Sequence, residues 1–184
     1  MTYRQQEDPR LCDFGPPYDY VVGSKYDPKL DVAAIAKLVR AEIKDAVKAG
    51  TLPKLKTSVR IDRYSGGQSL DVSIMDWGVD VINEEYVRFW QLNGDNVYNP
   101  NRQLNQLGIK IQERLEGIRE QYNYNRSYVQ TDYFDVNFYG RVTWDWKQMR
   151  SKLEDKAAEL ERGQAPALAS QDFDSGLAPT LSTT

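Results

Sequence analysis

The sequence predicts an α+β fold: a small antiparallel sheet of about three strands, built on a central β-hairpin, with four helices packed mainly on one face. Two stretches on either side of a glycine-rich turn alternate apolar and polar residues, which is the period of a half-buried strand. Four other stretches repeat apolar residues every three or four positions, as amphipathic helices do. The chain has 184 residues, 40% of them hydrophobic, and is therefore long enough to bury one core.

The hairpin spans Lys54 to Asp76. Its apolar-face positions are Leu55, Thr57, Val59 and Ile61 in the first arm and Leu70, Val72 and Ile74 in the second. Pairing Val59 with Val72 and Ile61 with Leu70 keeps this set on one face and sets Arg60 opposite Asp71. A slip of one residue would turn the whole set toward water, so the pattern specifies the register. The turn Tyr64-Ser65-Gly66-Gly67 is expected to place both glycines at positive φ.

The helix boundaries follow from capping residues and stop signals. The first helix is expected between the N-cap Asp31 and Gly50, the second from Asn83-Glu84-Glu85 to Asn93-Gly94, the third from Asn99-Pro100 to Tyr122, and the fourth from the cap Asp145 to Arg162. Gly108 and Gly117 interrupt the third helix and are expected to allow close packing against another element. The apolar side of the fourth helix is predicted at Trp146, Met149, Leu153, Ala157 and Leu160.

The third strand is predicted where Phe134, Val136 and Phe138 alternate with polar residues and Tyr139. Residues 1–30 are expected to form an irregular N-terminal arm, with an edge strand at Tyr18 to Val22. Residues 31–162 are expected to form a single α+β domain. The remaining residues, 163–184, are rich in Ala, Pro, Ser and Thr and predict a disordered C-terminal tail.

Positive charge is concentrated in one part of the chain, although the net charge is −3. Residues 37–63 carry eight Lys or Arg and three Asp or Glu. Four of these cations fall within about a quarter of the first helix's circumference. One interpretation is a solvated helix face, because Lys and Arg are good helix formers. The other is a phosphate-binding patch that continues into the hairpin. Its candidate residues are Lys37, Arg40, Lys44, Lys48, Arg60, Arg63 and, as the only nearby aromatic residue for stacking, Tyr64.

The composition argues against an enzyme. The chain has no histidine and one cysteine, Cys12, so histidine-dependent nucleophile systems, His-containing zinc sites and thiolate clusters are all excluded. Glu84-Glu85 and the pair Asp132 and Asp135 are better explained as a helix start and as solvated acids than as a metal site. No metal ligands and no cofactor are predicted. A single cysteine and the lack of a hydrophobic signal or membrane segment favour the cytoplasm and no membrane partner.

Two stretches carry a family pattern: residues 35–44, IAKLVRAEIK, and residues 58–72, SVRIDRYSGGQSLDV, in which the Tyr-Ser-Gly-Gly turn is the most specific feature. In these stretches the chain resembles the large polyvalent protein-associated domains of phage and conjugative elements. Phe134-Asp135 is a further point of similarity, and the resemblance covers Asp31 to Val142. The chain is expected to depart from that family in two ways. It has a long helical insert from Asn99 to Tyr122, and it lacks the giant multidomain context in which the domains of that family occur.

The resemblance implies an accessory protein of a phage or mobile element, with no catalytic residues, acting beside incoming DNA or against host systems. Together with the basic residues it predicts a binding module that contacts nucleic acid through the first helix and the hairpin. The alternative is a protein-binding module that inhibits or redirects a host defence factor. The sequence specifies neither the host protein nor an oligomeric state.

Overall fold

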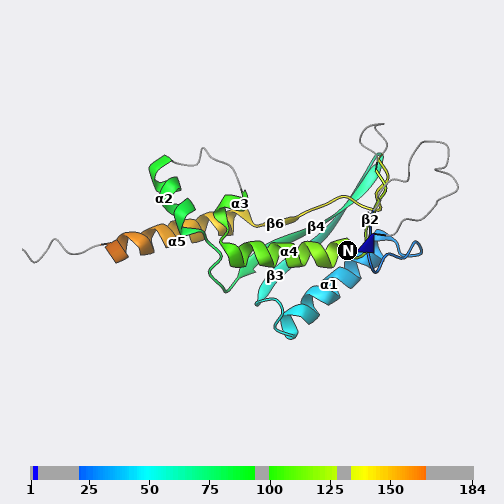
Figure 1. Ribbon diagram of the computed structural model, residues 1–184, viewed down its shortest axis with the longest axis horizontal. Helices are drawn as coiled ribbons and strands as arrows, with labels where there is room; N and C mark the ends of the chain where they lie inside the picture. Colours follow the sequence, from blue (N-terminus) through cyan, green and yellow to red (C-terminus); the bar gives the residue numbers. More distant parts are fainter. Residues whose placement is uncertain (1, 4–20, 94–99, 128–133, 165–184) are drawn as a thin grey trace, which may run out of the picture.

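The computed structural model describes residues 2–3, 21–93, 100–127 and 134–164. The elements in chain order are β1 (Thr2–Tyr3), β2 (Val21–Val22), α1 (Val32–Lys48), β3 (Leu55–Tyr64), β4 (Gly67–Trp77), α2 (Glu84–Asn93), α3 (Pro100–Gln103), α4 (Gln106–Glu120), β5 (Tyr124–Asn125), β6 (Val142–Trp144) and α5 (Trp146–Gln164). The predicted α+β class with a central hairpin is confirmed (Figure 1).

The hairpin has the predicted register. Val59 pairs with Val72, Ile61 with Leu70 and Arg60 with Asp71 in an antiparallel ladder that is irregular between Lys56 and Thr57. The turn is only partly as expected. Gly66 has a φ of 91°, but Gly67 is not among the positive-φ glycines.

The predicted orientation and position of the third strand are wrong. The sheet order is β3-β4-β6, and β6 runs parallel to β4, pairing Val72 with Val142 and Ile74 with Trp144. The helices between β4 and β6 form a long crossover that returns the chain to the hairpin end of β4, and a strand that starts there runs parallel to β4. Residues 134–139 form isolated bridges instead: Ser69 with Tyr139 and Asn125 with Val136.

A second, small sheet has the order β1-β2-β5 and is antiparallel throughout. A strand is therefore present at the end of the predicted stretch Tyr18 to Val22, as β2, but it is the central strand of this sheet and not an edge strand. The rest of the predicted irregular arm, except Thr2–Tyr3 and residues 21–30, lies outside the described residues. So does the predicted tail beyond Gln164.

Helices α1 and α4 lie on the apolar face of the large sheet (Figure 1). The core between them is formed by Val59, Leu70, Val72 and Ile74 of the sheet, Ile35, Val39 and Ile43 of α1, and Ile111, Leu115 and Ile118 of α4. The opposite face of the hairpin presents the alternate, polar positions of β3 and β4. The helices therefore cover one face of the hairpin, as predicted.

Helices α2 and α5 contact each other at the end of the sheet away from the hairpin turn (Figure 1). The indole rings of Trp77 and Trp144 meet edge to face there, with centroids 4.8 Å apart. Met149, Leu153 and Ala157 of α5 are buried as predicted, but Trp146 is 67% exposed. Asp145 accepts a hydrogen bond from the Gln148 amide and caps α5 as expected.

The predicted third helix is interrupted. The short α3 ends at Gln103, Leu104 bridges Ile82, and Asn105 caps a separate helix, α4. Close packing explains Gly108, because a Cβ there would lie 3.1 Å from the Val81 Cβ. It does not explain Gly117, where a Cβ would meet nothing within 4 Å. None of the helices in the described residues has the length and apolar content to span a bilayer.

Candidate nucleic-acid interface

Three of the predicted cations form one row along the outer side of α1. Asp31 fixes the start of this helix, since its carboxylate accepts a hydrogen bond of 2.7 Å from the Ala34 amide. The buried residues of α1 face the sheet and α4, so Lys37, Lys44 and Lys48 point to solvent and are all exposed. Spacings of seven and four residues align them over roughly 16 Å of helix. Within the described residues, none of the three lysines forms an ion pair.

Arg40, the fourth cation of α1, has a structural contact that the sequence did not reveal. Its Nη2 atom donates a hydrogen bond of 2.5 Å to the carbonyl oxygen of Val59. Val59 lies in β3, which is an edge strand of the large sheet. Edge strands expose unpaired backbone groups that can template unwanted pairing. Arg40 therefore covers part of this edge and attaches α1 to it.

The hairpin residues of the predicted patch do not all join the lysine row. Val59 and Ile61 face the helices, so Arg60 and Tyr64, at alternate positions of β3, lie on the opposite face of the sheet. Arg63 falls on the helix side by the same alternation and is exposed. The structure thus brings together Lys37, Lys44 and Lys48, and it separates Arg60 and Tyr64 from them.

Two exposed residues that were not predicted to be part of the patch lie beside Tyr64 and Arg60. They are Tyr139 and Arg141, which reach the hairpin because the segment before β6 pairs with β4. The amide of Leu70 donates to the Tyr139 carbonyl over 2.8 Å, and the amide of Val72 donates to the Arg141 carbonyl over 3.0 Å. Their proximity depends on a non-local pairing for which the sequence carries no direct signal.

Gly140 permits this close pairing. Its φ is 139°, a value that L side chains rarely adopt, and a Cβ would lie 2.2 Å from the Leu70 carbonyl oxygen. The nearby Arg119 of α4 is buried, with its Nη1 atom 3.0 Å from the same Cβ position, and forms an ion pair with Glu120. The Nε and Nη1 atoms of Arg119 have no hydrogen-bond partner within the described residues.

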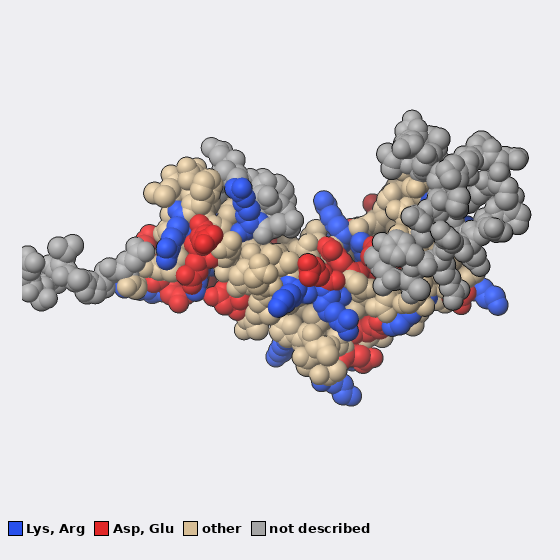
Figure 2. Space-filling model, viewed as in Figure 1, with Lys and Arg blue, Asp and Glu red and all other residues tan. Residues whose placement is uncertain are grey.

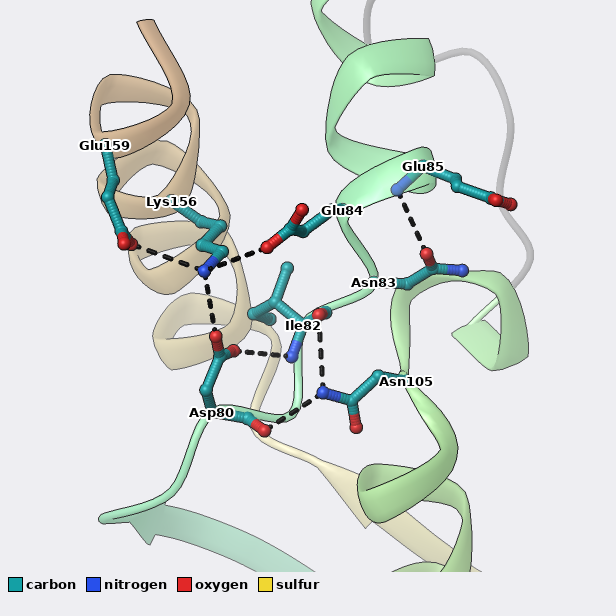
Figure 3. A network of polar contacts seen from close by, with 8 residues as sticks. All are labelled: Asp80, Ile82, Asn83, Glu84, Glu85, Asn105, Lys156 and Glu159. Atoms are coloured by element: carbon teal, nitrogen blue, oxygen red, sulfur yellow. Dashed lines mark hydrogen bonds and ion pairs between the residues drawn. The ribbon is translucent and has the colours of Figure 1, made fainter. Parts of the chain in front are cut away.

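The main cluster of titratable groups surrounds Lys156 of α5 (Figure 3). Its Nζ atom lies 3.0 Å from Asp80 Oδ2, 3.3 Å from Glu84 Oε1 and 3.4 Å from Glu159 Oε2. The hydrogen bond from Lys156 to Asp80 outweighs the opposing effect of burial and raises the pKa of the Lys156 ammonium. Burial alone would raise the pKa of the Asp80 carboxyl, but hydrogen bonds from Lys156 and the Ile82 amide hold it below its ordinary value.

This cluster joins three parts of the fold. Asn105 donates hydrogen bonds to the carbonyl oxygens of Asp80 and Ile82, while its own Oδ1 accepts from the Gly108 amide and caps α4 (Figure 3). The segment between β4 and α2 is thereby attached to both α4 and α5. The Lys156 ammonium is paired with carboxylates of the protein itself, which supports a structural role for this lysine.

Two tyrosines near β5 make similar structural contacts. Burial, together with a hydrogen bond to Glu42, raises the pKa of the Tyr122 hydroxyl, and the Glu42 carboxylate also pairs with Lys25. Burial and a hydrogen bond to Asp135 raise the pKa of Tyr124 to about 12. Both hydroxyls therefore stay protonated near neutral pH and act as hydrogen-bond donors.

The predicted absence of a metal site remains a prediction. Within residues 21–93, 100–127 and 134–164, no three acidic or other ligating side chains are grouped so that they could hold a metal ion. Asp132, one member of the acidic pair considered from the sequence, lies outside the described residues. The other member, Asp135, accepts the Tyr124 hydrogen bond.

A groove of about 650 Å³ runs between α5 and the segment from Trp77 to Ile82. Its charged side chains have both signs: Asp80, Lys152, Asp155, Lys156, Glu159 and Arg162. Lys152 lies over the Trp77 ring, 5.2 Å from its centroid. Because the charges are mixed, the groove favours neither an anionic nor a cationic ligand.

Blue and red side chains are interspersed on the face drawn in Figure 2, so this face has no continuous surface of one charge. Comparison with known proteins finds no match: no protein-family model, no curated protein and no solved structure matches the chain.

Proposed function

We propose that the protein is a non-enzymatic binding module that contacts the phosphates of nucleic acid through α1. The observation that carries this proposal is the row of Lys37, Lys44 and Lys48, which are exposed on one side of a helix and form no ion pair within the described residues. A lysine whose charge is not satisfied by the protein is available to neutralise a phosphate and release its counterion. The resemblance to domains of phage and conjugative elements supports an accessory role for such a module.

Salt dependence tests the proposal. Three phosphate contacts predict that log K falls with log salt with a slope of about −2 to −3. The contacts carry no sequence information, so the affinity should depend little on sequence. Binding of a fluorescein-labelled duplex and of one of its strands, followed by fluorescence anisotropy between about 50 and 300 mM salt, measures both properties.

Charge reversal locates the contacts. The triple variant Lys37→Glu, Lys44→Glu, Lys48→Glu should lose both affinity and salt dependence. Its fold should be retained, because all three side chains are exposed. The matched control reverses three exposed lysines elsewhere, Lys29, Lys110 and Lys147, and gives the same net charge. Equal binding by the two triple variants, or no binding by the unaltered protein at about 50 mM salt, would reject the proposal.

Exposed apolar residues favour the second candidate, a module that binds a host protein. Phe89 and Leu92 lie one turn apart on α2 and are 38% and 85% exposed. Clustered exposed apolar side chains often mark protein contacts. Recovery of the same host protein from lysate with and without nuclease, and its loss in the variant Phe89→Ser, Leu92→Ser, would favour this candidate over the first.

A further inference from the structure

The hairpin end of the open sheet face carries two exposed tyrosines. Tyr64 is 48% exposed and Tyr139 is 41% exposed. Tyr64 pairs with Gly67 across the hairpin, and Tyr139 bridges Ser69, so the two residues lie on either side of the same stretch of β4. Both belong to the face that α1 and α4 leave uncovered.

Gly67 shows how close the two rings are. A Cβ at Gly67 would lie 3.0 Å from Tyr64 Cε2 and 3.4 Å from Tyr139 Cε2. Because Gly67 is not a positive-φ residue, the space taken by the rings explains this glycine better than its backbone does. Because Gly67 has no side chain, no side-chain atom of this residue separates the two rings.

Two exposed arginines lie on the same face. Arg60 alternates with the buried Val59, and Arg141 alternates with the buried Val142. Asp71 pairs with Arg60 in the ladder, but its oxygens accept hydrogen bonds from Ser69 Oγ and from the Arg141 amide. Neither arginine forms an ion pair within the described residues, so both guanidinium groups can contact a phosphate beside the aromatic surface. Two acids on this face oppose them: the exposed Asp62 and the half-buried Asp71, which keeps its charge because both of its hydrogen-bond donors are neutral.

We propose that this surface, formed by Tyr64, Tyr139, Arg60 and Arg141, binds single-stranded nucleic acid by stacking unpaired bases on the tyrosines while phosphates contact the arginines. The proposal rests on the proposed function and specifies its partner. Aromatic side chains beside cations are the usual platform for unpaired bases, whereas the bases of a duplex are stacked inside it and cannot reach them.

The proposed contacts do not distinguish ribose from deoxyribose. A tyrosine ring stacks on the face of a base and an arginine contacts a phosphate, and both groups are present in DNA and in RNA. DNA and RNA strands of the same sequence should therefore bind alike.

Anisotropy titrations with a labelled DNA strand of about 15 nucleotides, its duplex and the RNA strand test the proposal. The unaltered protein should bind the DNA strand more tightly than the duplex. Tyr64→Ala and Tyr139→Ala should each weaken strand binding by about 5- to 100-fold and leave duplex binding unchanged. Tyr64→Phe should retain binding, because phenylalanine also stacks. Asp62→Asn, which removes one opposing charge and leaves both rings in place, should strengthen strand binding.

Trp146→Ala is the matched control, because Trp146 is an exposed aromatic residue at the start of α5. It should leave every affinity unchanged. Equal affinity for strand and duplex, with no effect of the tyrosine variants, would overturn the stacking proposal and leave the lysine row intact. A strong preference for the RNA strand would overturn the absence of ribose selection. Absence of binding to any of the three probes would overturn both this proposal and the proposed function.

Discussion

Replacing Lys156 with methionine tests how much the charge cluster between α5 and α2 contributes to stability. Methionine retains much of the apolar stem, so the change mainly removes the charge. The Lys156 side chain is 12% exposed, but its partners Asp80, Glu84 and Glu159 are 55%, 52% and 66% exposed. Each pair is therefore screened by water and contributes a few tenths of a kcal/mol up to about 1 kcal/mol. Together they predict a loss of about 1 to 2 kcal/mol in the free energy of unfolding.

Urea unfolding followed by tryptophan fluorescence measures this loss. Lys156→Met should lower the urea midpoint by about 0.5 to 1 M. High salt should reduce the difference from the unaltered protein, because exposed partners are screened. Lys44→Met is the control, since Lys44 is exposed and forms no ion pair in the described chain. A variant as stable as the unaltered protein, or a loss that does not change with salt, would refute the electrostatic account.

The same cluster predicts a direction for the pH dependence. The lowered pKa of Asp80 means that its contribution is present above the ordinary value of 3.8 and is lost as the pH falls through the lowered pKa. The raised pKa of Lys156 means that its contribution is present below 10.5 and is lost only in stronger alkali. The difference between the unaltered protein and Lys156→Met should therefore be constant from about pH 5 to 9 and should shrink in acid.

Four further changes test the fold, each by its thermal or urea midpoint. Gly140→Ala should cost about 1 to 3 kcal/mol or more, because its φ of 139° is strained for alanine and its Cβ would meet the Leu70 carbonyl. Gly117→Ala, where a Cβ meets nothing within 4 Å, should instead stabilise α4 by up to about 1 kcal/mol. Asn105→Ala removes the α4 cap and should cost about 1 to 2 kcal/mol. Val72→Asp buries a charge at a fully buried site and should cost several kcal/mol, so a stable, folded variant would contradict the sheet.

The parts of the fold predicted from the sequence are those fixed by local patterns. The hairpin register follows from two facing alternations, since only one pairing keeps Val59, Ile61, Leu70 and Val72 on one face. The caps Asp31 and Asp145 follow from side chains that accept hydrogen bonds from amides three residues later. These interactions span a few residues or one turn, so the sequence shows them directly.

The wrong predictions concern features decided by distant parts of the chain. The direction of β6 depends on the end of β4 to which the crossover returns. The sequence of residues 142–144 does not indicate which end this is. The break at Asn105 was hidden because the buried Leu104 continues the apolar repeat of α4. Asn105 separates α3 from α4, because its side chain caps α4 and also donates hydrogen bonds to the carbonyl oxygens of Asp80 and Ile82, which are remote in sequence.

The residues of the candidate site show the same difference between local patterns and long-range packing. The helical spacing of Lys37, Lys44 and Lys48 was sufficient to find the row on α1. The contact between Arg40 and the Val59 carbonyl could be recognised only from the position of α1 against the sheet edge. The separation of Arg60 from the row could have been inferred, because its alternation with Val59 puts it on the face opposite the helices. The position of Tyr139 beside Tyr64 could not have been inferred, because the pairing of Tyr139 with Ser69 is non-local.

The two proposed contact surfaces lie on different sides of β3, and this arrangement constrains the partner. The lysine row is on α1, the helix that covers the apolar face of the large sheet. The tyrosines are on the opposite, open face of that sheet. A rigid duplex seated on one surface cannot turn around the edge strand to reach the other, whereas a flexible single strand can pass around it at Arg40. Loss of the lysines should therefore weaken strand and duplex alike, since both carry phosphates. Loss of the tyrosines should weaken the strand alone, so the two sets of variants separate phosphate binding from base stacking.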